Sequence, residues 1–162
     1  MRHLIAGILT VALLTPTLAW SDWKYARWGA TPEQVAQASG GAVKVLPAGK
    51  RKKHPQPWNS ETAAAGSYVE GALHLDLSFS FDLKSGGLNC IVFSAVGNSP
   101  DSLFKQMFVG LNGAPQTSED HKDLGMQTFS WSGKKDQVGL TLMKAGGSFA
   151  TQCVPGANPP VE

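Results

Sequence analysis

A histidine and an aspartate stand two residues apart in the most regularly alternating stretch of the chain, Val69 to Asp82. Apolar and polar residues alternate there with a period of two, which predicts one long strand with a buried and a solvated face. His74 and Asp76 would lie side by side on the solvated face, close enough for a hydrogen-bonded pair or two metal ligands. The same face would also carry Glu70, Ser78 and Ser80.

This polar face has three interpretations. A metal site would need further ligands, which the segment Glu119 to Asp123 could supply through His121, making a small metal-binding protein or hydrolase. Without such ligands the face is either an ordinary solvated sheet surface or a surface that binds a partner. The sequence contains no Gly-x-Ser-x-Gly nucleophile elbow and no glycine-rich loop that opens a helix, so we expect no catalytic serine and no cofactor.

Positive charge gathers at one place, Lys50, Arg51, Lys52 and Lys53. These residues form either a solvated loop or an anion-binding patch for lipopolysaccharide or another polymer. The chain as a whole has 14 Lys and Arg against 12 Asp and Glu, a formal net charge of +2. A nearly neutral protein is not expected to bind nucleic acid.

The first 19 residues are typical of a secretory signal peptide. A basic start precedes an apolar run that is too short to span a bilayer, and small residues at Thr17 and Ala19 favour cleavage after Ala19. We therefore expect a periplasmic or secreted protein without a later transmembrane segment. In that oxidising setting Cys90 and Cys153 are expected to form a disulfide, which would stabilise the fold by about 4 kcal/mol in the chain-entropy model.

A short phrase occurs twice, as "GATPEQV" at residues 29–35 and as "GNSPDSL" at residues 97–103. Both read Gly-x-[Thr/Ser]-Pro-[Asp/Glu]-x-[Val/Leu], which is typical of a helix start with Thr31 or Ser99 as the N-cap. The phrase predicts helices over 32–39 and 100–111, the first with a capping box from Gln34. The second helix carries an apolar stripe of Leu103, Phe104, Met107, Phe108 and Leu111.

Strands are predicted after each helix. In the first half they cover 43–46, 69–82 and 88–96, with a polar loop through Asn59 between the first two. In the second half they cover 126–132, 137–144 and 148–154. The pattern predicts an α+β fold of two tandem helix-plus-antiparallel-sheet units, residues 20–96 and 97–154, with the helices on one face of the sheet. Residues 155–162 are expected to be a disordered tail.

The opening phrase, with Trp28 before Gly29, resembles the aromatic-Gly-x-Thr-x-x-Gln-Val opening of the β-lactamase inhibitor protein family. It is also similar to the opening of the small lipoprotein of the outer-membrane β-barrel assembly machinery, and to short exported bacterial proteins that begin Trp-Gly-x-[Thr/Ser]-Pro-x-x-Val. The resemblance implies helix-plus-sheet units that work by binding other proteins. The second copy has Val96 and Ser102 where the family has an aromatic residue and Gln, and a single cysteine in each half excludes the inhibitor family's intra-unit disulfides.

These observations favour an exported, non-catalytic binding module whose partner is another envelope or secreted protein. The aromatic residues Trp23, Tyr25 and Trp28 are expected to pack against the fold where the chain enters it. Trp28→Ala is therefore expected to lower stability first and binding only secondarily. The alternative is that they are exposed and form a partner hot spot.

Overall fold

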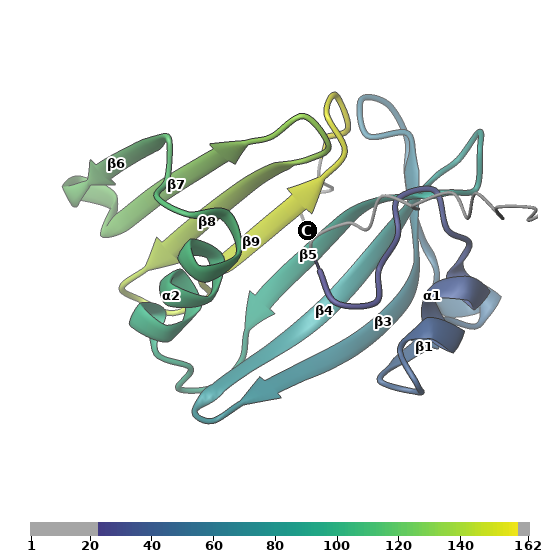
Figure 1. Ribbon diagram of the computed structural model, residues 1–162, viewed down its shortest axis with the longest axis horizontal. Helices are drawn as coiled ribbons and strands as arrows, with labels where there is room; N and C mark the ends of the chain where they lie inside the picture. Colours follow the sequence, from purple (N-terminus) through teal and green to yellow (C-terminus); the bar gives the residue numbers. More distant parts are fainter. Residues whose placement is uncertain (1–22, 159–162) are drawn as a thin grey trace, which may run out of the picture.

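The computed structural model describes residues 23–158 of the chain, which are mostly antiparallel sheet (Figure 1). The expected signal peptide at residues 1–19 therefore lies outside the described residues. Two α-helices, two 3-10 turns and nine strands follow one another within 23–158. In chain order they are α1 (Pro32–Ala38), β1 (Val43–Val45), η1 (Ala48–Lys50), β2 (Lys52–His54), β3 (Ser60–Glu70), β4 (Leu73–Asp82), β5 (Leu88–Ala95), α2 (Asp101–Asn112), β6 (Thr117–His121), η2 (Lys122–Leu124), β7 (Met126–Ser132), β8 (Gln137–Met143) and β9 (Phe149–Cys153).

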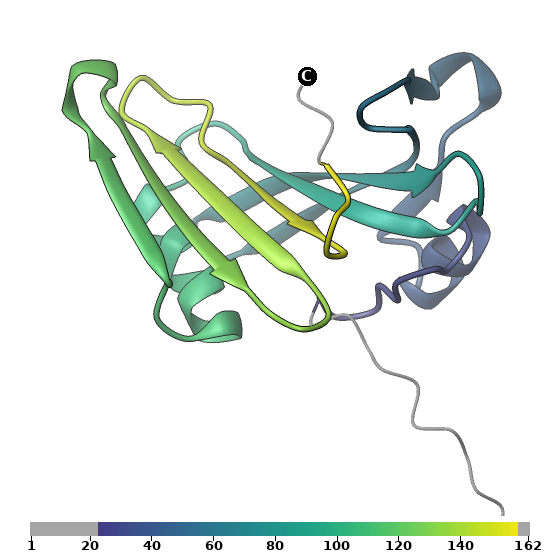
Figure 2. The ribbon, with the colours of Figure 1, turned by 90° about the horizontal axis from the view of Figure 1, so that it is seen from above.

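All nine strands of the described chain belong to one sheet with the order β1-β3-β4-β5-β9-β8-β7-β6, and β2 also pairs with β3. The fold is α+β, but the prediction of two tandem helix-plus-sheet units is wrong, because the sheet dominates and is continuous. The physical reason is that β5 and β9 each have a neighbour on both edges, so the two halves share backbone hydrogen bonds. Figure 2 shows β7–β9 rotated relative to β3–β5, as expected of one twisted sheet.

The predicted disulfide is confirmed, and it lies where the two halves meet. Cys90 of β5 and Cys153 of β9 are directly opposite each other in the antiparallel register, with 4.1 Å between their Cα atoms. The bridge closes a loop with a sequence separation of 63, and a loop of this length corresponds to about 4 kcal/mol in the chain-entropy model. It therefore fixes β5 beside β9.

The predicted long strand over 69–82 is wrong, because the chain reverses at Gly71, whose φ of 58° suits a two-residue hairpin turn. Glu70 ends β3 and pairs with Leu73 at the start of β4. Residues paired across a sheet share a face, so Glu70 lies on the same side as Leu73, while Val69 faces the other side with His74. The unbroken alternation in the sequence conceals this change of face.

The repeated phrase forms a helix start in its first copy as predicted. Thr31 accepts a hydrogen bond from the Gln34 backbone, and the Gln34 side chain accepts one from the Thr31 backbone. In the second copy Pro100 is the N-cap of α2, so the prediction that Ser99 caps this helix is wrong. The Ser99 hydroxyl donates instead to the carbonyls of His74 and Val96, because the chain turns there from β5 toward α2.

No helix within 23–158 has the length and hydropathy needed to cross a bilayer.

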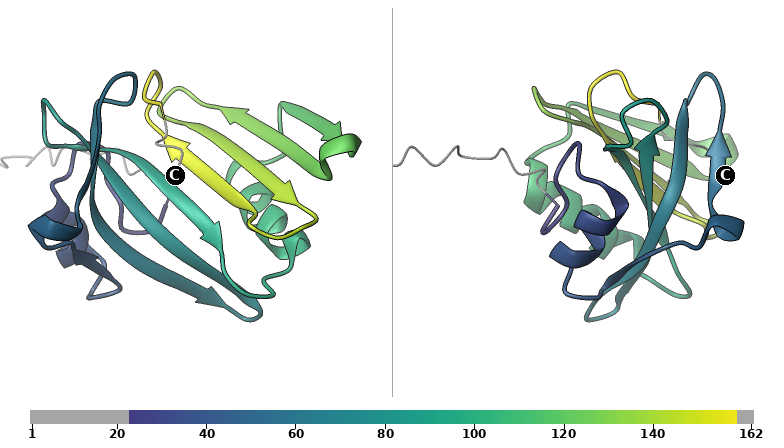
Figure 3. Two further views of the ribbon diagram at one scale, coloured as in Figure 1. Left: turned by 180° about the vertical axis from the view of Figure 1, so that it is seen from behind. Right: turned by 90° about the vertical axis from the view of Figure 1, so that its right-hand side faces the viewer.

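Both helices and the segment that precedes α1 lie on the same side of the sheet, and Figure 3 shows the strands from the opposite side. The N-terminal segment is attached to β5, since Gly29 N–H donates to the Leu88 carbonyl at 2.9 Å and Leu88 N–H donates to Ala30 at 2.8 Å. A Cβ atom on Gly87 would stand 2.8 Å from the Gly29 Cα, so this close approach requires glycine at 87.

A row of aromatic rings fills the core between the sheet and these segments. The Trp23 indole meets Tyr68 and Phe93 edge to face, with centroids 5.2 and 4.8 Å apart. Phe93 contacts Phe108 of α2 at 5.2 Å, and Phe108 contacts Trp131 of β7 at 6.3 Å. The row therefore joins strands from both halves of the sheet into one apolar cluster.

We predict that Trp23→Ala lowers the free energy of unfolding by about 3–5 kcal/mol, because it removes a fully buried ring that connects Tyr68 to Phe93 in this row. Trp23 is 1 % exposed, whereas Trp28 is half-buried, so Trp28→Ala should cost less. Trp23→Phe keeps a ring and removes an indole N–H that has no hydrogen-bond partner, so it should also cost less. Urea unfolding of the three variants measures the order; a larger loss for Trp28→Ala than for Trp23→Ala would contradict this account.

Candidate functional site

The face of the sheet opposite the helices carries uncharged side chains over four neighbouring strands. On β5, β9, β8 and β7 the residues that alternate with the buried core positions point to this side. Apart from the two disulfide-bonded cysteines, all of them are exposed or half-buried. We call this set the central face: Val92, Ser94, Phe149, Thr151, Gln137, Gly139, Thr141, Met143, Met126, Thr128, Ser130 and Ser132.

The hydroxyl groups of the central face are aligned across the strands. Thr141 is paired with Thr128 of β7 on one side and with Phe149 of β9 on the other. In the neighbouring row Ser130 lies opposite Gly139, and its hydroxyl is 2.6 Å from that of Thr117 on β6. Apart from Phe149, the side chains at these positions are short, which allows another surface to approach the strands closely.

Charged groups lie at the two margins of this face. His74 and Asp76 are exposed on β4, beyond β5. Glu119 and His121 lie on β6, beyond β7, where the two side chains approach to 3.4 Å. An uncharged centre between charged margins matches the usual arrangement of a protein interface, which has a core depleted in charge and a polar rim.

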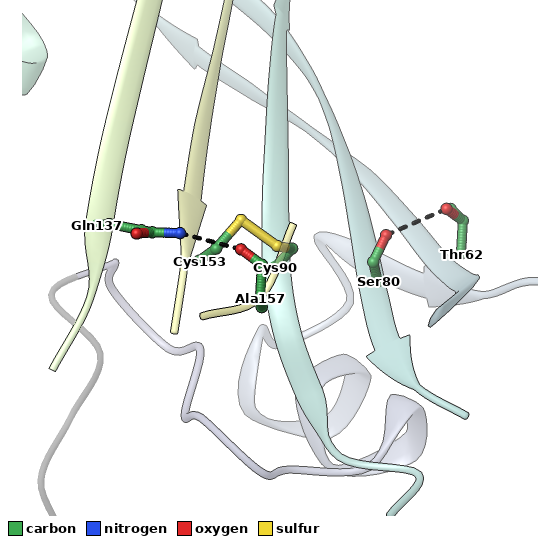
Figure 4. Close-up of a disulfide and its surroundings, with 6 residues drawn as sticks. All are labelled: Thr62, Ser80, Cys90, Gln137, Cys153 and Ala157. Carbon is green, nitrogen blue, oxygen red and sulfur yellow. Dashed lines mark hydrogen bonds between the residues drawn. A yellow bond between two sulfur atoms is a disulfide. The ribbon is translucent and has the colours of Figure 1, made fainter. Parts of the chain in front are cut away.

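The five predicted partner-binding residues do not form one surface. His74 and Asp76 are exposed on the uncovered side, and Ser78 is half-buried beside Val92 of the central face. Ser80 is fully buried, and its hydroxyl lies 3.2 Å from that of Thr62 (Figure 4).

Glu70 is on the helix side of the sheet, where the Tyr68 hydroxyl donates a hydrogen bond to its carboxylate.

The structure separates the residues of the hypothetical metal site. His74 and Asp76 are on β4, whereas His121 is on β6, with β5, β9, β8 and β7 between them. Within residues 23–158 no group of three or more His, Cys, Asp or Glu side chains could hold a metal ion. The convergence that the metal-site alternative requires is not found among the described residues, because His121 lies on β6, an edge strand, with four strands between it and β4.

The basic cluster is also divided by the fold. Arg51 donates from Nε to the Leu46 carbonyl at 2.9 Å and lies 3.6 Å from the Glu61 carboxylate, so it supports the loop. Lys50 precedes it in η1, and Lys52 and Lys53 follow on β2, where neighbouring side chains point to opposite sides. Anion binding by this cluster stays a prediction.

The central face and the strand order behind it were not predicted from the sequence. A signal for this face is nevertheless present, because alternate positions of "MQTFSWS", "QVGLTLM" and "FATQC" hold no charged residue. Recognising it as one surface requires the pairing of β5 with β9, which joins strands that are far apart in the chain.

No protein-family model, no curated protein and no solved structure matches this chain. The resemblance of residues 29–35 to the β-lactamase inhibitor family therefore stays a prediction, and function has to be argued from the site.

We predict that Glu70→Gln lowers the pKa of Tyr68. Burial, followed by the hydrogen bond and charge of Glu70, raises this pKa from 10.0 to about 12, and the variant removes the charge while burial stays. Because the folded pKa is raised, Tyr68 contributes stability that is full below pH 10 and is lost as the pH rises toward 12. Phenolate absorbance measures the titration in a Tyr25→Phe background, where Tyr68 is the remaining tyrosine. Glu119→Gln, at the other end of the sheet, is the control, and equal titrations of wild type and Glu70→Gln would contradict the placement of Glu70.

Proposed function

We propose that the protein is a non-catalytic binding module that docks the central face of its sheet onto another exported protein. The observation that carries this proposal is the contrast between the two faces. One is covered by helices and filled with aromatic rings, and the other is uncovered and uncharged over four strands.

Physical chemistry favours contact with a protein at such a face. Removing a charged group from water without a partner is far more costly than removing a hydroxyl or a thioether. Serine and threonine hydroxyls can also exchange water for hydrogen-bond partners on the opposite surface. Apolar area is provided by Val92, Met143 and Phe149, of which Phe149 is 36 % exposed. These residues can supply the buried centre of an interface while His74 and Glu119 stay solvated at its rim.

The composition of the central face supports binding rather than catalysis. A serine or threonine nucleophile needs a neighbouring general base. The partners of Thr141 across the strands are Thr128 and Phe149, and those of Thr151 are Val92 and Gly139. None of these residues can act as a base at neutral pH, so the middle of the face lacks one. Carboxylates stand opposite hydroxyl residues only at the margins, where Asp76 pairs with Ser94 and Glu119 pairs with Thr128.

Two features support a partner outside the cytosol. The Cys90–Cys153 disulfide is a bond that persists in oxidising compartments. The first 19 residues have the pattern of a secretory signal peptide. The proposed partner is therefore another protein of the envelope or exterior, with a surface that is itself low in charge where it meets the central face.

A photo-crosslinking amino acid at position 141 tests the proposal in cells that produce the protein. We expect one discrete adduct with a second protein, because Thr141 lies in the middle of the central face. Thr151→Lys in the same chain should abolish the adduct, since it places an unpaired charge in the interface. The fold should tolerate this lysine because Thr151 is half-exposed on the uncovered side.

The matched control places the same crosslinker at Ser118, which is exposed on β6 but belongs to the other side of the sheet. The proposal fails if position 141 gives no adduct, or if position 118 gives the same one. An adduct with twice the mass of the chain would identify a second copy as the occupant and would also contradict a different partner protein.

A further inference from the structure

A second site lies at the end of the sheet next to the disulfide. Gly29 and three segments line a cavity of about 470 Å³ there: residues 57–59, residues 82–89 and residues 154–158. Figure 4 shows the disulfide between Cys90 and Cys153. Asn89 immediately precedes Cys90 and Val154 immediately follows Cys153, so the disulfide fixes two of the walls relative to each other. The volume is in the range of small-molecule sites.

Asn89 is a polar residue of the cavity wall whose side-chain oxygen has no hydrogen-bond partner. It occupies an irregularity of β5, because Ser80 pairs with Cys90 and Phe81 pairs with Leu88, leaving Asn89 unopposed. Its residue is 9 % exposed, yet its side-chain carbonyl oxygen accepts no hydrogen bond. A buried carbonyl without a donor costs about 1–3 kcal/mol. This oxygen has almost no accessible surface, so a ligand that donates to it would remove the cost only when the Asn89 side chain turns toward the cavity.

Asp82 is a second acceptor in the wall. The backbone N–H groups of Lys84 and Ser85 donate to its Oδ1 at 3.1 and 2.7 Å, and the Ser85 hydroxyl donates to the same atom at 2.8 Å. These bonds, the one from the Ser85 backbone first, lower the pKa of the Asp82 carboxyl, so it is ionised at neutral pH. All three bonds end on Oδ1, which leaves Oδ2 to a ligand.

The remaining walls add an aromatic surface and more amides. Trp58 is half-buried and lines the cavity, and Asn59 and Asn158 line it as well. Amide groups both donate and accept hydrogen bonds, and an indole ring packs against apolar C–H groups. The cavity thus combines one ionised acceptor, several amides and one aromatic surface.

We propose that this cavity binds a neutral saccharide. A saccharide presents several hydroxyl donors to Asp82 and Asn89, and its hydroxyls also accept from amide N–H groups. Its C–H faces match the Trp58 ring. The site is distinct from the central face and does not depend on the protein partner proposed for that face.

The experiment is a titration of ¹⁵N-labelled protein with N,N′-diacetylchitobiose and with cellobiose at millimolar concentrations, followed by NMR. We expect at least one of the two sugars to shift the Trp58 indole N–H and the amide signals of Asn89. Asp82→Asn keeps an oxygen for the bonds from Ser85 but loses the charge, so it should weaken binding about tenfold or more. Glu119→Gln, the loss of an exposed carboxylate elsewhere, is the matched control and should bind as wild type.

A second variant separates binding from folding. Asn89→Ala removes the unpaired carbonyl, so it should abolish the shift of the Trp58 indole N–H while the thermal midpoint stays equal or rises. The proposal is overturned if neither sugar shifts these signals, or if N-methylacetamide alone shifts them equally. It is also overturned if Asp82→Asn binds as tightly as Glu119→Gln, or if Asn89→Ala lowers the midpoint, which would make Asn89 a structural residue.

Discussion

The edge-to-face contact of the Trp23 indole with Tyr68 and Phe93 is the constraint on which the rest of the structure depends. Trp23 precedes the first helix, yet its ring packs against residues of strands β3 and β5. From Phe93 the row of ring contacts passes through Phe108 to Trp131 of β7. Both halves of the sheet therefore pack against one row of aromatic rings. A sheet that shares its core in this way needs β5 beside β9, and the disulfide joins those two strands on the opposite face.

Placing the large rings on one side determines the character of the other. The helices and the N-terminal segment cover the aromatic side, so the alternating positions of β5, β9, β8 and β7 stay uncovered. Those positions hold hydroxyls, a glycine and a few apolar side chains, with charge only at the margins on β4 and β6. Such a face suits contact with a protein, while the cavity beside the disulfide, lined by Asp82, Asn89 and Trp58, suits a small polar ligand.

Local signals were predicted well from the sequence, and pairings between distant strands were not. The capping box of Thr31, the strands β5, β7, β8 and β9 and the disulfide follow from capping chemistry, alternation and cysteine usage. The hairpin at Gly71 was missed because alternation continues through it, and the edge strands β2 and β6 because their sequences are polar. Exposure of His74 and Asp76 was predicted correctly, but the central face depends on strand order, which alternation does not encode.

Native-state hydrogen exchange tests most directly whether the two halves share one core. If they do, the backbone amides of β4 and β5 and those of β8 and β9 open with the same free energy, and denaturant removes their protection together. This result is expected because the β5–β9 hydrogen bonds and the Trp23 row connect them. If denaturant removed the protection of the β7, β8 and β9 amides while those of β3, β4 and β5 stayed protected, the result would contradict the account. It would show that the two halves unfold as separate units.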